Sequence, residues 1–237
     1  MKKCIGVLLA VFLVVGFAGQ AAASFGDGTL TQVVYNANDN EVAVDLGITT
    51  GLDYSPYSNV ELAAPGSVEL NDFGSEVNAW ADLNVGYFSA TGSPGYIGYF
   101  STTKTSRPDY RWDFGLHTGG TDLYSEYDSD DVDGDGINVQ KALETSNPNT
   151  FEQKLGANYG GFNIDSEDGL ANLGALDSGG SVDMYLYRWD IATPIDGPTG
   201  EDYQGILRLN ADGSTVLNPV PVPGAVLLFG TGLLGFF

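Results

Sequence analysis

The residues best suited to chemistry are a run of carboxylates within residues 128–138. Asp131, Asp133 and Asp135 stand at alternate positions in this run and are separated by small or apolar residues. Carboxylates spaced in this way can direct their oxygens onto one calcium ion, and the glycines between them allow a tight turn. We predict a weak calcium loop with Asp131, Asp133, Asp135 and the backbone carbonyl of Ile137 as ligands. The alternative interpretation is a solvated acidic turn.

This run resembles the Asp-x-Asp-x-Asp-Gly opening of EF-hand and thrombospondin type 3 calcium loops. The resemblance implies calcium ligation by oxygens, with an affinity on the order of 10⁻⁴ to 10⁻³ M, the range of extracellular modules. Position 12 counted from Asp131 is Ala142, where an EF-hand has a bidentate glutamate. Water or Glu144 would therefore have to complete the shell.

A second candidate is an aromatic row formed by Tyr185, Tyr187 and Trp189 on one face of an expected strand. Side chains alternate along a strand, so Val182, Met184 and Leu186 are expected on the opposite face. If the aromatic face is exposed, it would stack against sugar rings and bind polysaccharide. The alternative is a central strand that is buried on both faces.

The sole histidine, His117, is expected on the polar side of a strand over Arg111–Leu116. No nucleophile motif accompanies it, and one histidine without any cysteine beyond Cys4 does not supply the usual zinc ligands. The 31 Asp and Glu residues offer many carboxylate pairs for glycoside hydrolysis, and their abundance singles out none. We predict a protein that is not an enzyme, with a secreted glycan-active hydrolase as an alternative.

The elements that position these residues are expected to be mostly strands. Gly, Asn, Asp and Ser separate short segments rich in Val, Tyr, Leu and Phe, which is typical of an all-β domain with many turns. We predict an all-β, jelly-roll-like β-sandwich whose last two strands form a hairpin at Asp212-Gly213. The expected strands are Leu30–Tyr35, Glu41–Leu46, Leu83–Ser89, Tyr96–Thr102, Arg111–Leu116, Ser181–Trp189, Gly205–Leu209 and Ser214–Leu217.

Two segments interrupt the strand pattern with the apolar spacing of a helix. Val139–Leu143 is the first, and Phe151–Leu155 is the second. Thr150 with Gln153 resembles a capping box that opens the second segment, and Gly156 is placed to end it. We therefore predict one or two short helices inserted around residues 138–156.

The N-terminus has the three parts of a secretory signal peptide. Two lysines precede an apolar run, and the small residues Ala21 and Ala23 fit the signal peptidase pattern. Removal of residues 1–23 would leave seven Lys and Arg against 31 Asp and Glu, a formal charge of −24. Such a surface repels phosphate backbones, so we predict no nucleic-acid partner.

The C-terminal segment 219–237 combines alternate prolines with an apolar run. Through Val220, Pro221, Pro223 and Gly224 it resembles the PEP-CTERM sorting signal of Gram-negative bacteria. The resemblance implies transient association of the tail with the membrane and cleavage by an exosortase-type protease. Valine stands in place of the family's glutamate and no basic cluster follows the apolar run, which predicts a truncated C-terminus.

Together these features predict three parts: a signal peptide at 1–23, a β-sandwich at 24–218 and a Pro-rich sorting tail at 219–237. Passage through the periplasm to the cell surface or the extracellular medium follows from the two terminal signals. The leading functional prediction is a non-enzymatic surface or extracellular-matrix protein. A carbohydrate-binding module for extracellular polysaccharide is the first alternative and the hydrolase is the second.

Overall fold

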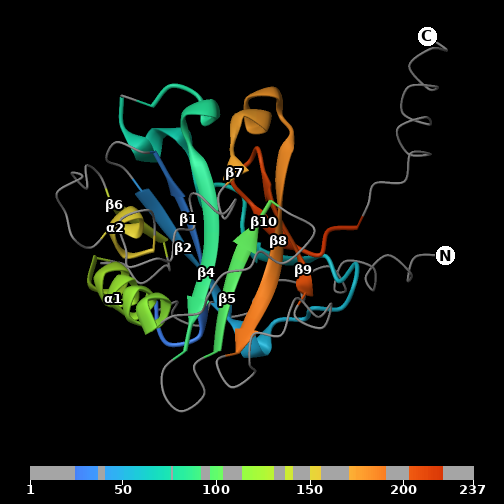
Figure 1. The fold of residues 1–237 in the computed structure, drawn as a ribbon. Coiled ribbons are helices and arrows are strands. Elements are labelled where there is room, and N and C mark those ends of the chain that lie inside the picture. Colours follow the sequence, from blue (N-terminus) through green and yellow to red (C-terminus); the bar gives the residue numbers. More distant parts are fainter. Residues whose placement is uncertain are drawn as a thin grey trace, which may run out of the picture.

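One continuous sheet of ten antiparallel strands is formed by the described residues of a computed structural model (Figure 1). The structure describes residues 25–36, 41–75, 77–91, 97–103, 114–130, 137–140, 150–155, 171–190 and 203–220. The strand order is β3-β10-β9-β8-β5-β4-β1-β2-β6, and β7 also pairs with β4. The strands are β1 (Thr29–Tyr35), β2 (Glu41–Ile48), β3 (Val60–Ala63), β4 (Asn84–Ala90), β5 (Ile97–Thr102), β6 (Ile137–Gln140), β7 (Ala171–Asn172), β8 (Ser181–Asp190), β9 (Tyr203–Asn210) and β10 (Thr215–Leu217).

The sheet curls until it nearly closes. As a result, β3 at one end of the strand order contacts β2 near the other end. Alternate residues of every long strand point inward, so one apolar core fills the interior. Leu30 and Val34 of β1, Met184 of β8 and Leu207 of β9 are completely buried in it. The 3₁₀ turn η3 (Trp80–Asp82) adds Trp80 to this core. The predicted all-β, sandwich-like fold is therefore confirmed.

Helices cover part of the outer face of the sheet. They are α1 (Phe114–Asp130) and α2 (Phe151–Lys154), which lie together on the side of β1, β2 and β4, away from β8 and β9 (Figure 1). Leu123, Tyr124 and Tyr127 of α1 pack with outward residues of β1 and β4 in a second apolar cluster. The centre of the sheet is thus buried on both faces.

Close contact between α1 and its neighbours depends on two glycines. A Cβ atom at Gly119 would lie 2.4 Å from the carbonyl oxygen of Lys154, and one at Gly120 would lie 2.9 Å from the Cβ of Ala90. No larger side chain fits at either position without displacing α2 or β4. This stretch forms a helix despite the low helix propensity of glycine.

Several sequence predictions about secondary structure are confirmed. The strands expected near β1, β2, β4, β5, β8, β9 and β10 are present, and Phe151–Leu155 contains α2. The predicted hairpin has a tight loop in which Gly213 adopts a φ of 81° and donates to the carbonyl of Asn210. A type I turn followed by a left-handed residue is common in such hairpins.

Two predictions were wrong. The strand expected over Arg111–Leu116 is helical from Phe114 onward, so His117 lies in α1; residues 111–113 are outside the described part. The segment Val139–Leu143 was expected to be helical, but its first two residues belong to β6, which pairs with β2 through Val42 and Val139; residues 141–143 are outside the described part. The sheet edge offered by β2 outweighs the local helical spacing there, because pairing satisfies the backbone groups.

Candidate binding face on strands β8 and β9

Strand β8 has an apolar face and a second face that carries polar and aromatic side chains. Val182, Met184 and Leu186 point into the core, and their exposed fractions are at most 9%. Tyr185 and Tyr187 point outward, as the sequence pattern predicts. The outcome lies between the two interpretations of the aromatic row, because Tyr187 is 4% exposed whereas Tyr185 is half-buried. The side chain of Trp189 lies outside the described part.

Strand β9 supplies the other half of the face. Asp183 pairs with Arg208, Tyr185 with Ile206 and Tyr187 with Tyr203. A register shift after Leu186 brings Tyr203 to this position, where its side chain is 42% exposed. We call this two-by-three arrangement the tyrosine face; its members are Asp183, Tyr185, Tyr187, Tyr203, Ile206 and Arg208.

Tyr203 contacts both of the other tyrosines of the face. The ring centroids of Tyr187 and Tyr203 are 5.7 Å apart, and those of Tyr185 and Tyr203 are 6.4 Å apart with their planes tilted by 46°. Beneath them the ring of Tyr187 stacks on that of Phe100 at 6.1 Å. Aromatic pairs at such separations are mutually attractive. Tyr203 therefore rests on a fixed aromatic base that connects it to the apolar cluster under α1.

Arg208 and Asp183 close one end of the tyrosine face with a bidentate ion pair. The guanidinium donates from Nε and Nη2 to the two carboxylate oxygens of Asp183 at 2.7 and 2.8 Å. This hydrogen bonding raises the pKa of Arg208. Two of the five N–H donors of arginine are used in this geometry, so the group retains donor capacity while the pair is electrically neutral.

Burial raises the pKa of both Tyr187 and Tyr203, and the neighbouring tyrosine hydroxyls add to the shift. Both phenols are consequently uncharged at neutral pH and able to donate a hydrogen bond. The face combines apolar rings, neutral hydroxyls and one internally balanced ion pair.

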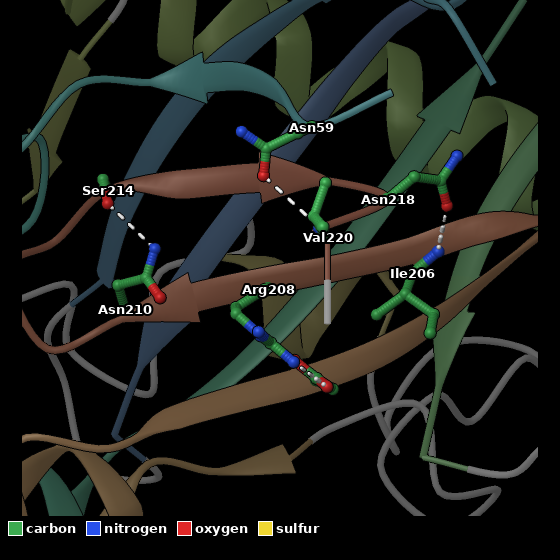
Figure 2. A network of polar contacts seen from close by, with 8 residues as sticks. Asn59, Ile206, Arg208, Asn210, Ser214, Asn218 and Val220 are labelled. Atoms are coloured by element: carbon green, nitrogen blue, oxygen red, sulfur yellow. Dashed lines mark hydrogen bonds and ion pairs between the residues drawn. The ribbon is translucent and has the colours of Figure 1, made fainter. Parts of the chain in front are cut away.

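A second polar arrangement lies at the end of β10, around Asn218 (Figure 2). The side-chain oxygen of Asn218 accepts from the backbone N–H of Ile206 at 2.9 Å, and its amide donates to the carbonyls of Tyr54 and Ser55. Its own N–H donates to the carbonyl of Ile206 at 2.7 Å, and its carbonyl accepts from Asn59. We call this network the Asn218 knot.

The Asn218 knot depends on unusual backbone geometry. Asn218 and Asn59 have φ values of 49° and 51°, in the left-handed region that asparagine tolerates better than most residues. A Cβ at Gly205 would clash with the side-chain oxygen of Asn218 at 2.2 Å, so glycine is required there. Beyond the knot, Val220 is 48% exposed and its N–H approaches the side-chain oxygen of Asn59 at 3.4 Å.

Most other residues singled out by the sequence lie outside the described part of the chain. These are Asp131, Asp133 and Asp135 of the calcium loop, Ala21 and Ala23, and Pro221, Pro223 and Gly224. Ile137 is the first residue of β6, immediately after the acidic run, and pairs with Val44. Within the described ranges no three His, Cys, Asp or Glu side chains gather as a metal site. The calcium loop stays a prediction.

Sequence reasoning missed Tyr203 and Arg208. Tyr203 precedes the expected strand Gly205–Leu209 by two residues, and its place opposite Tyr187 depends on a register shift that no local pattern signals. Arg208 had a local signal: it stands between Leu207 and Leu209 in the sequence, and this alternation indicates that its side chain points outward.

The comparisons with known proteins give no assignment. No protein-family model, no curated protein and no solved structure matches this chain. None of the helices in the described residues has the length and apolar character needed to cross a membrane.

Proposed function

We propose that the protein is an exported, non-enzymatic component of the cell surface or extracellular matrix, whose folded body is delivered by its C-terminal sorting tail. The observation that carries this proposal is the Asn218 knot. It ties β10 to β9 and to the loop before β3 through Asn218 itself, one residue before the Pro-rich segment begins. A tail that starts at Pro219 can be cut without removing any described strand.

Two carboxylates, the buried Glu41 and the exposed Asp177, accept structural hydrogen bonds, which supports a structural role for this domain. Glu41 is 3% exposed and accepts hydrogen bonds from the Tyr127 hydroxyl at 2.9 Å and from the Phe151 N–H at 3.0 Å. Asp177 accepts from the N–H groups of Trp80 and Ala81. These carboxylates hold backbone and side-chain donors of neighbouring elements, and such satisfied groups stabilise the fold.

The export step is tested by N-terminal sequencing of the secreted protein, which should begin at Ser24. Mature protein that still begins at Met1 would contradict export by a cleaved signal peptide.

The sorting step is tested with a chain to which a short Arg/Lys cluster is added after Phe237, expressed in hosts with and without an exosortase. We expect cleavage near Pro221–Pro223 only in the first host, read from the intact mass. The matched control carries Pro221→Ala and Pro223→Ala, which removes the extended conformation that proline enforces. Equal masses from the two hosts would reject the sorting proposal.

A chain that ends at Asn218 tests whether the folded body ends at this residue. It should retain the unfolding midpoint of the longer protein, because the hydrogen bonds of the Asn218 knot are kept and the contact of the exposed Val220 with Asn59 is long, at 3.4 Å. A large loss of stability would show that the tail is part of the fold.

A further inference from the structure

We propose that the tyrosine face binds single chains of neutral polysaccharide, with Tyr203 and Tyr185 as the stacking residues and Arg208 as the hydrogen-bonding residue. This inference concerns the folded body alone and does not require the sorting tail. It goes beyond surface display by assigning a ligand class and a set of contact residues.

The exposed part of the tyrosine face matches the two-sided chemistry of a sugar ring. A pyranose presents C–H groups on one side, which pack on aromatic rings, and hydroxyl groups around its edge. Tyr203 is 42% exposed and Tyr185 is half-buried beside it, so both offer ring surface. The Asp183–Arg208 pair on the same face lies next to Tyr185 along the outward side of the strands and provides donors and acceptors for hydroxyls.

The charge of the protein favours a neutral ligand over an anionic one. The only described cation on the face, Arg208, is already neutralised by both oxygens of Asp183. The mature chain carries a formal charge of −24 in total, which repels uronate and sulfate polymers. Neutral hexose polymers meet no such barrier.

The tilt of the two rings selects a flexible chain over a flat surface. Their planes differ by 46°, so one planar object cannot lie against both rings. Two successive sugars can do so, because rotation about the glycosidic bond lets each adopt the plane of one ring. We therefore expect binding to soluble single chains and not to crystalline fibres.

Tyr187 acts as a positioning residue for this face. It is 4% exposed, stacks on Phe100 and supports Tyr203 at 5.7 Å. It has little surface left for a ligand, so its contribution is to hold Tyr203 in place before binding. A preformed face loses less side-chain freedom when the ligand binds.

The test is affinity electrophoresis of the secreted protein in gels that contain hydroxyethyl cellulose, galactomannan or dextran, with alginate as the anionic comparison. Retardation by at least one neutral polymer is expected. Tyr203→Ala and Tyr185→Ala should each weaken it by roughly tenfold, the effect of losing an interface anchor. Tyr57→Ala is the matched control, because Tyr57 is 65% exposed and lies outside the face.

Two further variants, a pull-down and melting curves sharpen the result. Tyr203→Phe should retain most of the binding because the ring is kept, and Arg208→Gln should weaken binding to every neutral polymer that the wild type binds. Pull-down on crystalline cellulose should recover little protein. Melting curves of each variant establish that it is folded.

The proposal is wrong if none of the three neutral polymers retards the protein, if alginate retards it more strongly, or if the folded Tyr203→Ala/Tyr185→Ala double variant binds like the wild type. None of these outcomes alters the export and tail-cleavage tests, so the two proposals can fail separately.

Discussion

Glu41 illustrates how single residues use charge in this acidic protein. Its carboxylate joins three elements, because it belongs to β2 and accepts from Tyr127 of α1 and from the first residue of α2. Hydrogen bonds to a buried charged group are stronger than those between neutral groups. Removing the acceptor leaves a buried phenol and a buried N–H without this partner, which carries a desolvation penalty.

We expect Glu41→Ala to lower the free energy of unfolding by about 2–4 kcal/mol, since two donors lose a charged acceptor and a small cavity forms. Urea denaturation measures the change. Glu61→Ala is the control at an exposed carboxylate of β3, and it should alter stability by no more than about 0.5 kcal/mol. Equal effects at the two positions would show that the buried carboxylate has no special role.

At the scale of elements, α1 is a helix that packing imposes on an unfavourable sequence. Gly119 and Gly120 lower its intrinsic helix propensity, yet they allow the helix to approach α2 and β4. The gain comes from burial of Leu123, Tyr124 and Tyr127, which recur at helical spacing along one side.

Gly119→Ala should therefore destabilise the protein by about 1–3 kcal/mol, although alanine is the better helix former by about 1 kcal/mol. The new Cβ would meet the backbone oxygen of Lys154, which cannot move alone. Gly51→Ala is the matched control, because a Cβ at Gly51 would have no other atom within 4 Å. Thermal melting compares the two variants, and a Gly119→Ala protein as stable as the Gly51→Ala protein would contradict the packing argument.

Residues 131–136 of the acidic run connect α1 to β6, which makes calcium binding an element-scale prediction. Millimolar calcium should raise the melting temperature relative to chelator, as expected when an ion binds the folded state. Asp133→Ala and Asp135→Ala should each reduce the shift. An unchanged wild-type midpoint, or a shift that survives both substitutions, would identify a solvated acidic turn.

The sequence predicts those elements whose signal is local. Strand β2 alternates apolar and polar residues clearly, β1, β4 and β8 are short runs rich in β-branched and aromatic residues, and Asp212-Gly213 indicates its hairpin. The start of α1 could not be predicted, because Phe114 and Leu116 continue the alternation of a strand and only tertiary contacts favour the helix. Tyr203 lies on the tyrosine face because of a register shift, which depends on the pairing of β8 with β9 and has no local sequence signal.

At the scale of the whole molecule, buried tyrosines give the fold an alkaline limit. Tyr87, Tyr124 and Tyr127 are at most 3% exposed, and burial raises the pKa of each above its ordinary value. In the unfolded chain these phenols ionise near pH 10. Above that pH the unfolded state loses protons that the folded state retains, so deprotonation favours unfolding.

Stability from these three groups should be fully present below about pH 10 and fall by about 4 kcal/mol per pH unit above it, until the folded-state pKa values are reached. Tyrosinate absorbance and circular dichroism, followed together with rising pH, measure the effect. The buried phenols should ionise in the same cooperative step that unfolds the sheet. Gradual ionisation of all phenols in a folded protein would disprove the expectation.

The position of β10 has a mechanical consequence. It is the last described strand before the C-terminal segment. It is not an edge strand, because β9 pairs with it on one side and β3 on the other. Tension applied beyond residue 218 along the strand axis would load both hydrogen-bond ladders and the Asn218 knot in parallel, as shear. Under such a pull, β10 would have to break both ladders together instead of unzipping from one neighbour.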